Sequence, residues 1–192
     1  MGSLMVEQGS FQFPDGGSSP TPTLHVKDLR VERCEPSHAV AMVKQWHSRL
    51  PYCQDGPWMM AFRMHHDNIT YAVALWHNTS ARNLPQSWLE LRRMACGPSS
   101  PKNTPSRFLA IMGKLIKAYF PQCSRMISYQ DCEVHTGTIY KAAGWIASAS
   151  TPSPPRARNR EPNRKGTRRA YRTNSNGFAP NASAKIRWEK SL

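Results

Sequence analysis

Two segments of the chain have the apolar spacing of an amphipathic helix. In residues 106–121, SRFLAIMGKLIKAYFP, apolar side chains form one stripe, lysines lie opposite, and Pro121 ends the pattern. Residues 37–50 repeat this spacing, with Ser37 as a candidate N-cap. The sequence therefore predicts a helix over each segment. The stripe of the first-named helix consists of Phe108, Ile111, Met112, Leu115, Ile116 and Tyr119.

Short apolar runs between turn residues predict the strands. Residues 58–65 and 69–76 flank a turn-like His-Asp-Asn and predict a hairpin, whose nearly all-apolar second strand is expected at the centre of a sheet. A short helix is predicted over 136–145, with Gly144 near its end as a C-cap. Other strands are predicted at 25–34, 87–96, 124–131 and 145–150, and a short final strand at 186–192. This order predicts an α/β (α+β) fold with a mixed central sheet flanked by helices.

Composition divides the chain into parts. Residues 1–24 are rich in Gly, Ser, Pro and Thr with few apolar anchors, which predicts a disordered N-terminal segment. Residues 152–185 are dense in Arg, Asn and Pro and are expected to be a flexible basic segment. The ordered domain is therefore expected at 25–151, with residues 186–192 adding the final strand.

The charge balance favours a polyanionic partner. The chain has 26 Lys and Arg against 12 Asp and Glu, a formal net charge of +14. Residues 152–192 hold eleven basic against two acidic residues, and the 25–151 domain still has 15 against 8. Such an excess suits nucleic acid, although it also serves solubility alone. We expect the basic segment to contact phosphates through charge rather than to take part in chemistry. Its candidates are Arg164, Lys165, Arg168 and Arg169.

Cysteine usage and hydropathy predict a soluble protein of the cytoplasm. The five cysteines are odd in number and form no CxxC pair, which is typical of a reduced chain. No signal-like leader is present, and no apolar run approaches the roughly 20 residues of a membrane helix. The histidines do not have metal-ligand spacing, because consecutive histidines on a strand point to opposite faces. They are His65, His66, His77 and His135, among others.

The element order is similar to the GNAT acyltransferase fold. In that family a loop before the central helix holds the pyrophosphate of acyl-CoA. Here the usual Arg/Gln-x-x-Gly-x-Gly/Ala signature is replaced by CGPSSPKNTPSRFL, in which Pro101 and Pro105 lack N–H donors. The fold resemblance therefore does not extend to the signature that binds the coenzyme.

Four blocks of sequence resemble the Mom family of phage-type proteins, in order and in spacing. The blocks are ELRRMAC, PKNTPSRFL, ISYQD and HTGTIYKAAGW, and WHSRLP at 46–51 resembles the family's early His/Ser segment. The resemblance covers roughly residues 25–150 and the final RWE. Gln130 stands where the family commonly has alanine, and the spacer to His135 is short; neither departure removes a polar group.

The resemblance implies a transferase that modifies adenine in double-stranded DNA to a carbamoylmethyl derivative, which protects phage or prophage DNA from restriction in the bacterial cytoplasm. The exocyclic amine is a weak nucleophile, so the enzyme needs a proton acceptor, an oxyanion stabiliser and an extruded base. Asp131 or His135 would accept the proton. Tyr140, expected on the same helical face as Thr136, would donate to a leaving group. The early segment adds His47 and Ser48 as catalytic candidates.

The start of the long helix is the expected donor site, because free N–H groups at a helix N-terminus bind anions. Its candidates are Lys102, Asn103, Ser106 and Arg107, with the N–H groups of the last two facing the donor. Arg92 and Arg93 are candidates for DNA phosphates, and at most one should point to the site because they alternate on a strand. The donor stays open: an aminoacyl group such as glycyl supplies carbon and nitrogen, whereas acetyl-CoA supplies no nitrogen. Iron, linked to the Mom family, stays open too.

Each candidate also has a purely structural interpretation. Asp131 suits a turn, His135 a solvated loop, Tyr140 the core, and Ser106 the N-cap of its helix. Two further functions remain in competition with DNA modification. One is an acetyl-CoA-dependent N-acetyltransferase of a small molecule or protein. The other is a nucleic-acid-binding protein without catalytic activity, in which the basic segment does the binding.

Overall fold

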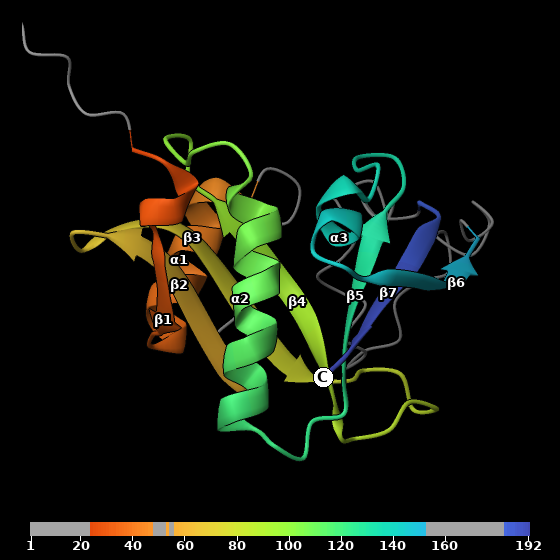
Figure 1. Ribbon diagram of the computed structural model, residues 1–192. Helices are drawn as coiled ribbons and strands as arrows, with labels where there is room; N and C mark the ends of the chain where they lie inside the picture. Colours follow the sequence, from red (N-terminus) through yellow and green to blue (C-terminus); the bar gives the residue numbers. More distant parts are fainter. Residues whose placement is uncertain (1–23, 48–52, 54–55, 153–182) are drawn as a thin grey trace, which may run out of the picture.

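The structure is a computed structural model that describes residues 24–47, 53, 56–152 and 183–192. Its helices and strands have the following bounds (Figure 1): η1 Val26–Asp28, β1 Arg30–Arg33, α1 Pro36–Trp46, β2 Met60–His66, β3 Ile69–Asn78, β4 Trp88–Cys96, α2 Thr104–Tyr119, β5 Arg125–Asp131, α3 Thr138–Ala142, β6 Ile146–Thr151 and β7 Lys185–Ser191. Ser48 and the four basic candidates at 164, 165, 168 and 169 lie outside the described residues.

In the described part of the chain, seven strands form one mixed sheet in the order β1-β2-β3-β4-β5-β7-β6. The predicted fold class is confirmed, and so is the final strand. That strand lies between β5 and β6, antiparallel to both. Its interior place explains why Trp188 is almost fully buried although it is close to the C-terminus.

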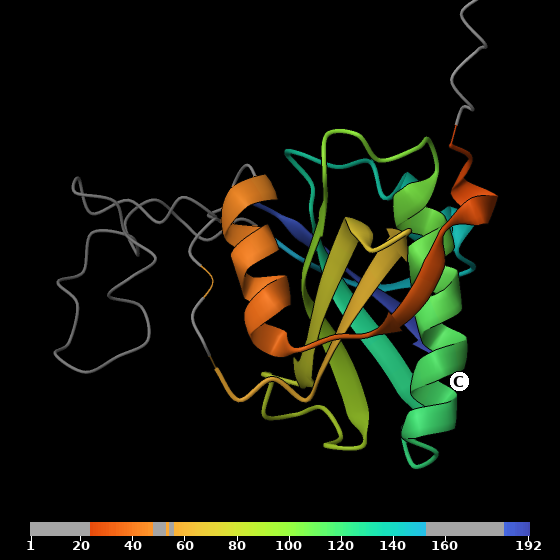
Figure 2. The same ribbon diagram turned by 90° about the vertical axis from the view of Figure 1, so that its left-hand side faces the viewer.

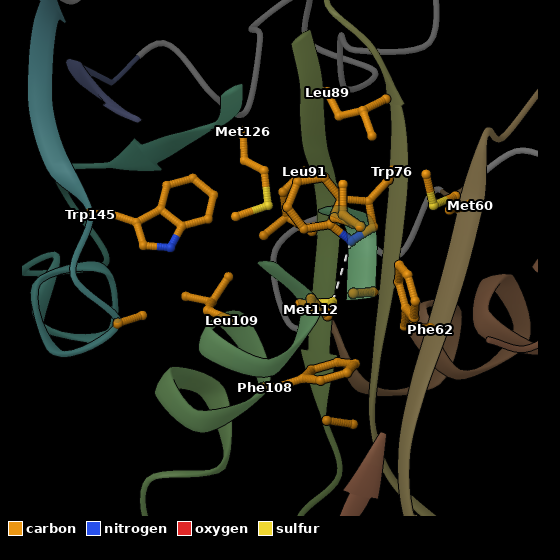
Figure 3. Close-up of a cluster of buried hydrophobic side chains, with 14 of the residues drawn as sticks. Met60, Phe62, Trp76, Leu89, Leu91, Phe108, Leu109, Met112, Met126 and Trp145 are labelled. Atoms are coloured by element: carbon orange, nitrogen blue, oxygen red, sulfur yellow. Dashed lines mark hydrogen bonds between the residues drawn. The ribbon is translucent and has the colours of Figure 1, made fainter. Parts of the chain in front are cut away.

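Helices cover both faces of the sheet. Helices α2 and α3 lie on one face and α1 on the other (Figure 2). The larger core lies beneath α2, where the Trp76 indole N–H donates to the Met112 sulfur at 3.3 Å, beside Phe62 and Phe108 (Figure 3). The smaller core lies beneath α1. It contains Ala39, Val40 and Val43 of that helix with Val73, Leu75 and Ala95 of the sheet.

Element boundaries differ from the sequence predictions at three starts. The first predicted strand, 25–34, opens with the 3₁₀ turn η1 and leaves only four residues of strand. Helix α1 begins at Pro36, so Ser37 is inside the helix and Glu35 holds the N-cap position. Helix α2 begins at Thr104 after Asn103 in a left-handed conformation (φ 69°). The prediction began this helix too late because a proline is well tolerated in the first helical turn, where no N–H is needed.

Two turns agree with the predictions. Asp67 and Asn68 have positive φ angles of 45° and 64°, the pair of left-handed residues that a tight hairpin turn needs. Gly144 follows the end of α3 with φ 73°. Its N–H bonds to the Lys141 carbonyl at 3.0 Å, and the next N–H bonds to the Tyr140 carbonyl at 2.9 Å. This pattern of two bonds is the Schellman motif, so the predicted C-cap is correct.

Strands β4 and β5 form a fork. Their parallel pairing runs from Trp88–Arg125 to Leu91–Ser128 and stops there among the described residues, although both strands continue. The register between β3 and β4 shifts beside Leu75, which leaves Arg92 as an extra residue in β4. Such a bulge bends its strand and increases the twist. The bulge therefore turns β4 away from β5, and the two strands diverge toward the end of the sheet at which α2 begins (Figure 1).

Candidate active site

A buried pair of hydroxyl groups lies at the base of the fork. The Ser128 Oγ is 2.9 Å from the Tyr140 Oη and 3.5 Å from the Leu91 carbonyl oxygen, so it joins β5, α3 and β4. The Tyr140 ring stacks on Trp188, with centroids 5.4 Å apart and planes 12° from parallel. Burial raises the pKa of Tyr140, and the hydrogen bond from Ser128 acts in the opposite direction. Tyr140 is therefore a protonated hydroxyl at neutral pH.

The predicted relation between Tyr140 and Thr136 is wrong. Helix α3 begins at Thr138, after Gly137 in a left-handed conformation with φ 77°. Thr136 precedes the helix, and its Oγ1 is 2.9 Å from the hydroxyl oxygen of Thr138. The two residues do not share a helical face, because the glycine reverses the chain between them.

Two further side chains, Arg93 and His135, lie within electrostatic range of His47. His47 ends α1, and its backbone N–H donates to the Val43 carbonyl at 2.9 Å. Its pKa is lowered, first by burial and then by electrostatic interaction with Arg93 and with His135. Arg93 follows the bulge of β4, and His135 follows β5. The sequence indicated these residues one by one, and the structure brings them together.

Asp131 shapes the loop that carries His135. Its carboxylate accepts the Glu133 N–H at 3.1 Å and lies 3.5 Å from the Lys185 ammonium of β7. Its carbonyl oxygen accepts the N–H groups of Val134 and His135 at 3.2 and 3.0 Å. These contacts are those of a turn-forming residue. The proton-acceptor role expected for Asp131 stays a prediction.

The two adjacent arginines of β4 have different surroundings. Arg92, the bulged residue, pairs with the buried Glu90 at 3.0 Å and also donates to the Ser80 hydroxyl. Arg93 lies near His47, and one of its terminal nitrogens donates to the Arg92 carbonyl at 2.7 Å. This division agrees with the expectation that at most one of the two points to the site.

The start of α2 offers fewer N–H donors than expected. The Arg107 N–H donates to the Asn103 carbonyl at 3.1 Å, so the prediction that it is free is wrong. The Ser106 N–H has no backbone partner among the described residues, while its hydroxyl donates to the Asn103 carbonyl at 3.1 Å. Ser106 is in the first turn and is not the N-cap. Lys102 and Asn103 are exposed just before the helix.

The profile of the Mom protein family matches residues 28–178. This chain belongs to the Mom family. The match confirms the resemblance and extends it beyond residue 150, into the basic segment. No curated protein is similar in sequence at a significant level.

Solved structures place the Mom-family chain in the GNAT fold. A Bacillus subtilis acetyltransferase in complex with CoA has a TM-score of 0.55 and 13% identity, covering 85% of this chain and 99% of its own. The Escherichia coli N-acetyltransferase of ribosomal-protein-S18 alanine has a TM-score of 0.54 and 12% identity, and the match covers 85% of this chain and 94% of its own. An IAA acetyltransferase from Bacillus cereus has a TM-score of 0.52 and 13% identity, and the match covers 85% of this chain and 99% of its own. Family and fold together indicate a DNA-modification protein with a GNAT fold.

The described part of the Mom-family chain does not fit a bound iron ion. No three His, Cys, Asp or Glu side chains gather there in a way that could hold a metal. Burial raises the pKa of Cys34 to about 11 and that of Cys96 to about 12, so both stay thiols. Within the same ranges, no helix is both long and apolar enough to cross a membrane.

Sequence reasoning missed three residues around the site. Ser128 and Gln130 are polar yet buried, and Trp188 lies against both Tyr140 and Gln130. A signal for the first two exists: they alternate on a strand and share the face of buried Met126. The place of Trp188 could not be inferred, because nothing local to residues 185–191 shows which strands they pair with.

Proposed function

We propose that this protein transfers a group to the exocyclic amine of adenine in double-stranded DNA, giving a carbamoylmethyl-type modification that protects the DNA from restriction. The observation that carries the proposal is the electrostatic interaction of His47 with Arg93 and His135, beyond the end of the β4–β5 pairing, in a Mom-family chain.

His47 is the proton acceptor in this proposal. Burial and the neighbouring positive charges lower its pKa, so it is neutral at pH 7 and available as a base. The amine nitrogen attacks the donor carbonyl, a C–N bond forms, and the amine proton passes to His47. The bond to the donor's leaving group breaks as Tyr140 supplies a proton from the base of the fork. The immediate product is a glycyl amide of adenine. Its free glycyl amine then attacks C6 of the adenine ring and the original C6–N bond breaks, with a proton passing to the released amide nitrogen, which leaves the carbamoylmethyl amine. Arg93 and His135 stabilise the developing oxyanion.

The donor in this proposal is an aminoacyl group. A glycyl amide and a carbamoylmethyl amine are isomers, so a glycyl group brings every atom of the product. An acetyl group lacks the nitrogen. The loop before α2 also differs from a glycine-rich phosphate cradle, because Pro98, Pro101 and Pro105 lack N–H groups. The N–H groups of Gly97 and Ser100 are already bonded to backbone carbonyls.

Duplex DNA is the partner in the proposal. The target amine must leave the base stack before His47 can reach it, as in other enzymes that act on bases. Extrusion needs a grip on the phosphates on either side of the base. Eight Lys and Arg against one Glu in residues 153–182 supply the required charge.

Nucleoside mass spectrometry of DNA from cells that express the protein tests the proposal. We expect a modified deoxyadenosine whose mass equals a glycyl addition and whose fragments identify the carbamoylmethyl isomer. His47→Gln should abolish it, whereas Tyr119→Phe, a change on the exposed end of α2, should not. Unmodified DNA from folded wild-type protein, co-expressed with the other genes of its phage or prophage, would overturn the proposal.

The second candidate is an acetyl-CoA-dependent N-acetyltransferase, which the similarity to CoA-bound acetyltransferases favours. A thermal-shift experiment with acetyl-CoA separates the two. A ligand at 100 times its Kd stabilises the folded state by about 2.7 kcal/mol, which would raise the melting temperature measurably. We expect no rise, because the loop before α2 offers few N–H donors. A clear rise, together with unmodified DNA, would favour the second candidate.

A further inference from the structure

We infer that Gln130 is a positioning residue, which holds the backbone of His135 at the mouth of the fork. The inference rests on the proposed function, because it assigns a role to a neighbour of the proposed catalytic histidines. Gln130 is 4% exposed, at the penultimate position of β5. Nothing in the proposed chemistry needs an amide there.

The Gln130 side chain accepts one hydrogen bond and donates another. Its Oε1 accepts the indole N–H of Trp188 at 2.7 Å, and its Nε2 donates to the backbone carbonyl of His135. An indole N–H only donates and a carbonyl only accepts. A primary amide has an acceptor oxygen and a donor nitrogen, so it satisfies both from one position. This orientation follows from the partners and fixes the side chain.

His135 is held from both sides of its backbone. Its N–H donates to the Asp131 carbonyl at 3.0 Å, and its carbonyl accepts from Gln130. Two residues later, Gly137 lies directly on the pair: a Cβ there would be 2.5 Å from the Gln130 Oε1 and 2.5 Å from a Trp188 ring carbon. The backbone of an exposed histidine is therefore fixed from beneath by buried groups.

The same indole also contacts the base of the fork. Trp188 stacks on Tyr140, whose hydroxyl meets Ser128. One residue of β7 thus supports His135 through Gln130 and supports Tyr140 by its ring face. Loss of the amide should move His135 and leave Tyr140 in place, which separates a positioning role from general damage to the core.

Two variants of Gln130 remove the His135 contact differently. Gln130→Met has a similar length and forms neither hydrogen bond. Gln130→Glu keeps an acceptor for Trp188 but presents a carboxylate to the His135 carbonyl. A shift of about 1 Å in a catalytic group costs on the order of 10²-fold in rate. We expect both variants to lower kcat by that order, with the KM for DNA unchanged.

A matched pair of tryptophan variants controls for core damage. Trp188→Phe keeps an aromatic ring against Tyr140 and removes the donor to Gln130. Trp145→Phe alters another buried tryptophan against the same ring. The Trp145 indole N–H has no hydrogen-bond partner in the described part of the chain, so no such bond is lost. We expect Trp188→Phe to lower kcat and Trp145→Phe to leave it close to the wild-type value.

Histidine NMR supplies a readout that does not need activity. His47 is faced by Arg93 from β4 and by His135 from the loop after β5. When His135 moves away, the His47 pKa should rise in Gln130→Met and stay unchanged in Trp145→Phe. In a His135→Ala background, Gln130→Met should have no further effect on kcat, because the two act as a unit.

The outcomes separate this inference from the proposed function. If the wild-type protein leaves DNA unmodified and Gln130→Met raises the His47 pKa, the proposed function is overturned and the positioning role is supported. If the wild-type protein modifies DNA and Gln130→Met changes neither kcat nor the His47 pKa, only the positioning role is overturned. If Gln130→Met does not fold, Trp188→Phe answers the same question, and an unchanged kcat and His47 pKa in that variant would overturn the inference.

Discussion

The hydroxyl oxygens of Ser128 and Tyr140 lie 2.9 Å apart, where the pairing of β4 and β5 ends. Ser128 is the last paired residue of β5, and its partner in β4 is Leu91. The Ser128 hydroxyl at this junction therefore meets the tyrosine of α3. This contact connects the short helix to the base of the fork and places the tyrosine where the strands begin to separate.

Tyr140→Phe tests whether this hydroxyl acts in the reaction. The ring stack on Trp188 stays, so we expect the free energy of unfolding to fall by only about 1 kcal/mol, the worth of one hydrogen bond. DNA modification should fall much further, because the leaving group loses its proton donor. Urea unfolding and nucleoside mass spectrometry measure the two effects, with Tyr119→Phe as the control. Equal modification by Tyr140→Phe and wild type would remove Tyr140 from the mechanism.

The lowered pKa of His47 makes folding stability depend on pH. As pH falls below the ordinary histidine value of 6.5, the unfolded chain binds the proton before the folded chain does. The stabilisation is therefore complete above pH 6.5 and is lost progressively as pH falls toward the folded-state pKa. We expect His47→Gln to remove this part of the slope in urea unfolding between about pH 7.5 and 5. Exposed His25→Gln is the control, and an identical slope in both variants would contradict the assignment.

Two glycines with similar backbone angles should respond differently to alanine. Gly137 has φ 77° and Gly144 has φ 73°, so each alanine costs roughly 1–2 kcal/mol for the left-handed conformation. At Gly137 the new methyl group would also meet Gln130 and Trp188 at 2.5 Å, whereas at Gly144 it meets only the flexible Lys190 ammonium at 3.4 Å. Thermal unfolding should show a larger loss for Gly137→Ala. A larger loss for Gly144→Ala would mean that the loop over Gln130 yields easily.

Asp131→Asn separates a turn role from a base role. The amide oxygen can still accept the Glu133 N–H, while the charge opposite Lys185 is lost. We expect Asp131→Asn to keep most DNA modification, and Asp131→Ala to lose more of it because the turn before His135 loosens. Nucleoside mass spectrometry on both variants gives the comparison. If Asp131→Asn is as inactive as Asp131→Ala, the carboxylate itself acts as the base.

The basic segment should set the salt dependence of DNA binding. Each phosphate contact contributes roughly 0.9 to the slope of log K against log salt concentration. Replacing Arg168 and Arg169 by serine should lower that slope, whereas the same charge change at Lys114 and Lys117, on the exposed side of α2, should not. Fluorescence anisotropy with a labelled duplex at several salt concentrations measures both. Equal slopes would show that these arginines do not contact DNA.

Local pattern was sufficient for most of the fold. The apolar stripe of 106–121 specified α2, and the hairpin around Asp67 and Asn68 followed from apolar runs beside turn residues. The predicted starts of elements were wrong where the same residue or run suits two different local structures. Pro105 both ends a preceding loop and fits a first helical turn, and the 25–34 run reads as a strand although its start folds as a 3₁₀ turn.

The sequence by itself determined the element order, the basic charge and the individual polar candidates, because hydrophobic periodicity and residue chemistry are local properties. Only the tertiary structure decided which candidates meet. His47, from the end of α1, comes within electrostatic range of Arg93 of β4 and of His135, which follows β5. Gln130 gained a role because β7 enters between β5 and β6 and brings Trp188 against it. Strand pairing joins residues far apart in the chain, and no local pattern records it.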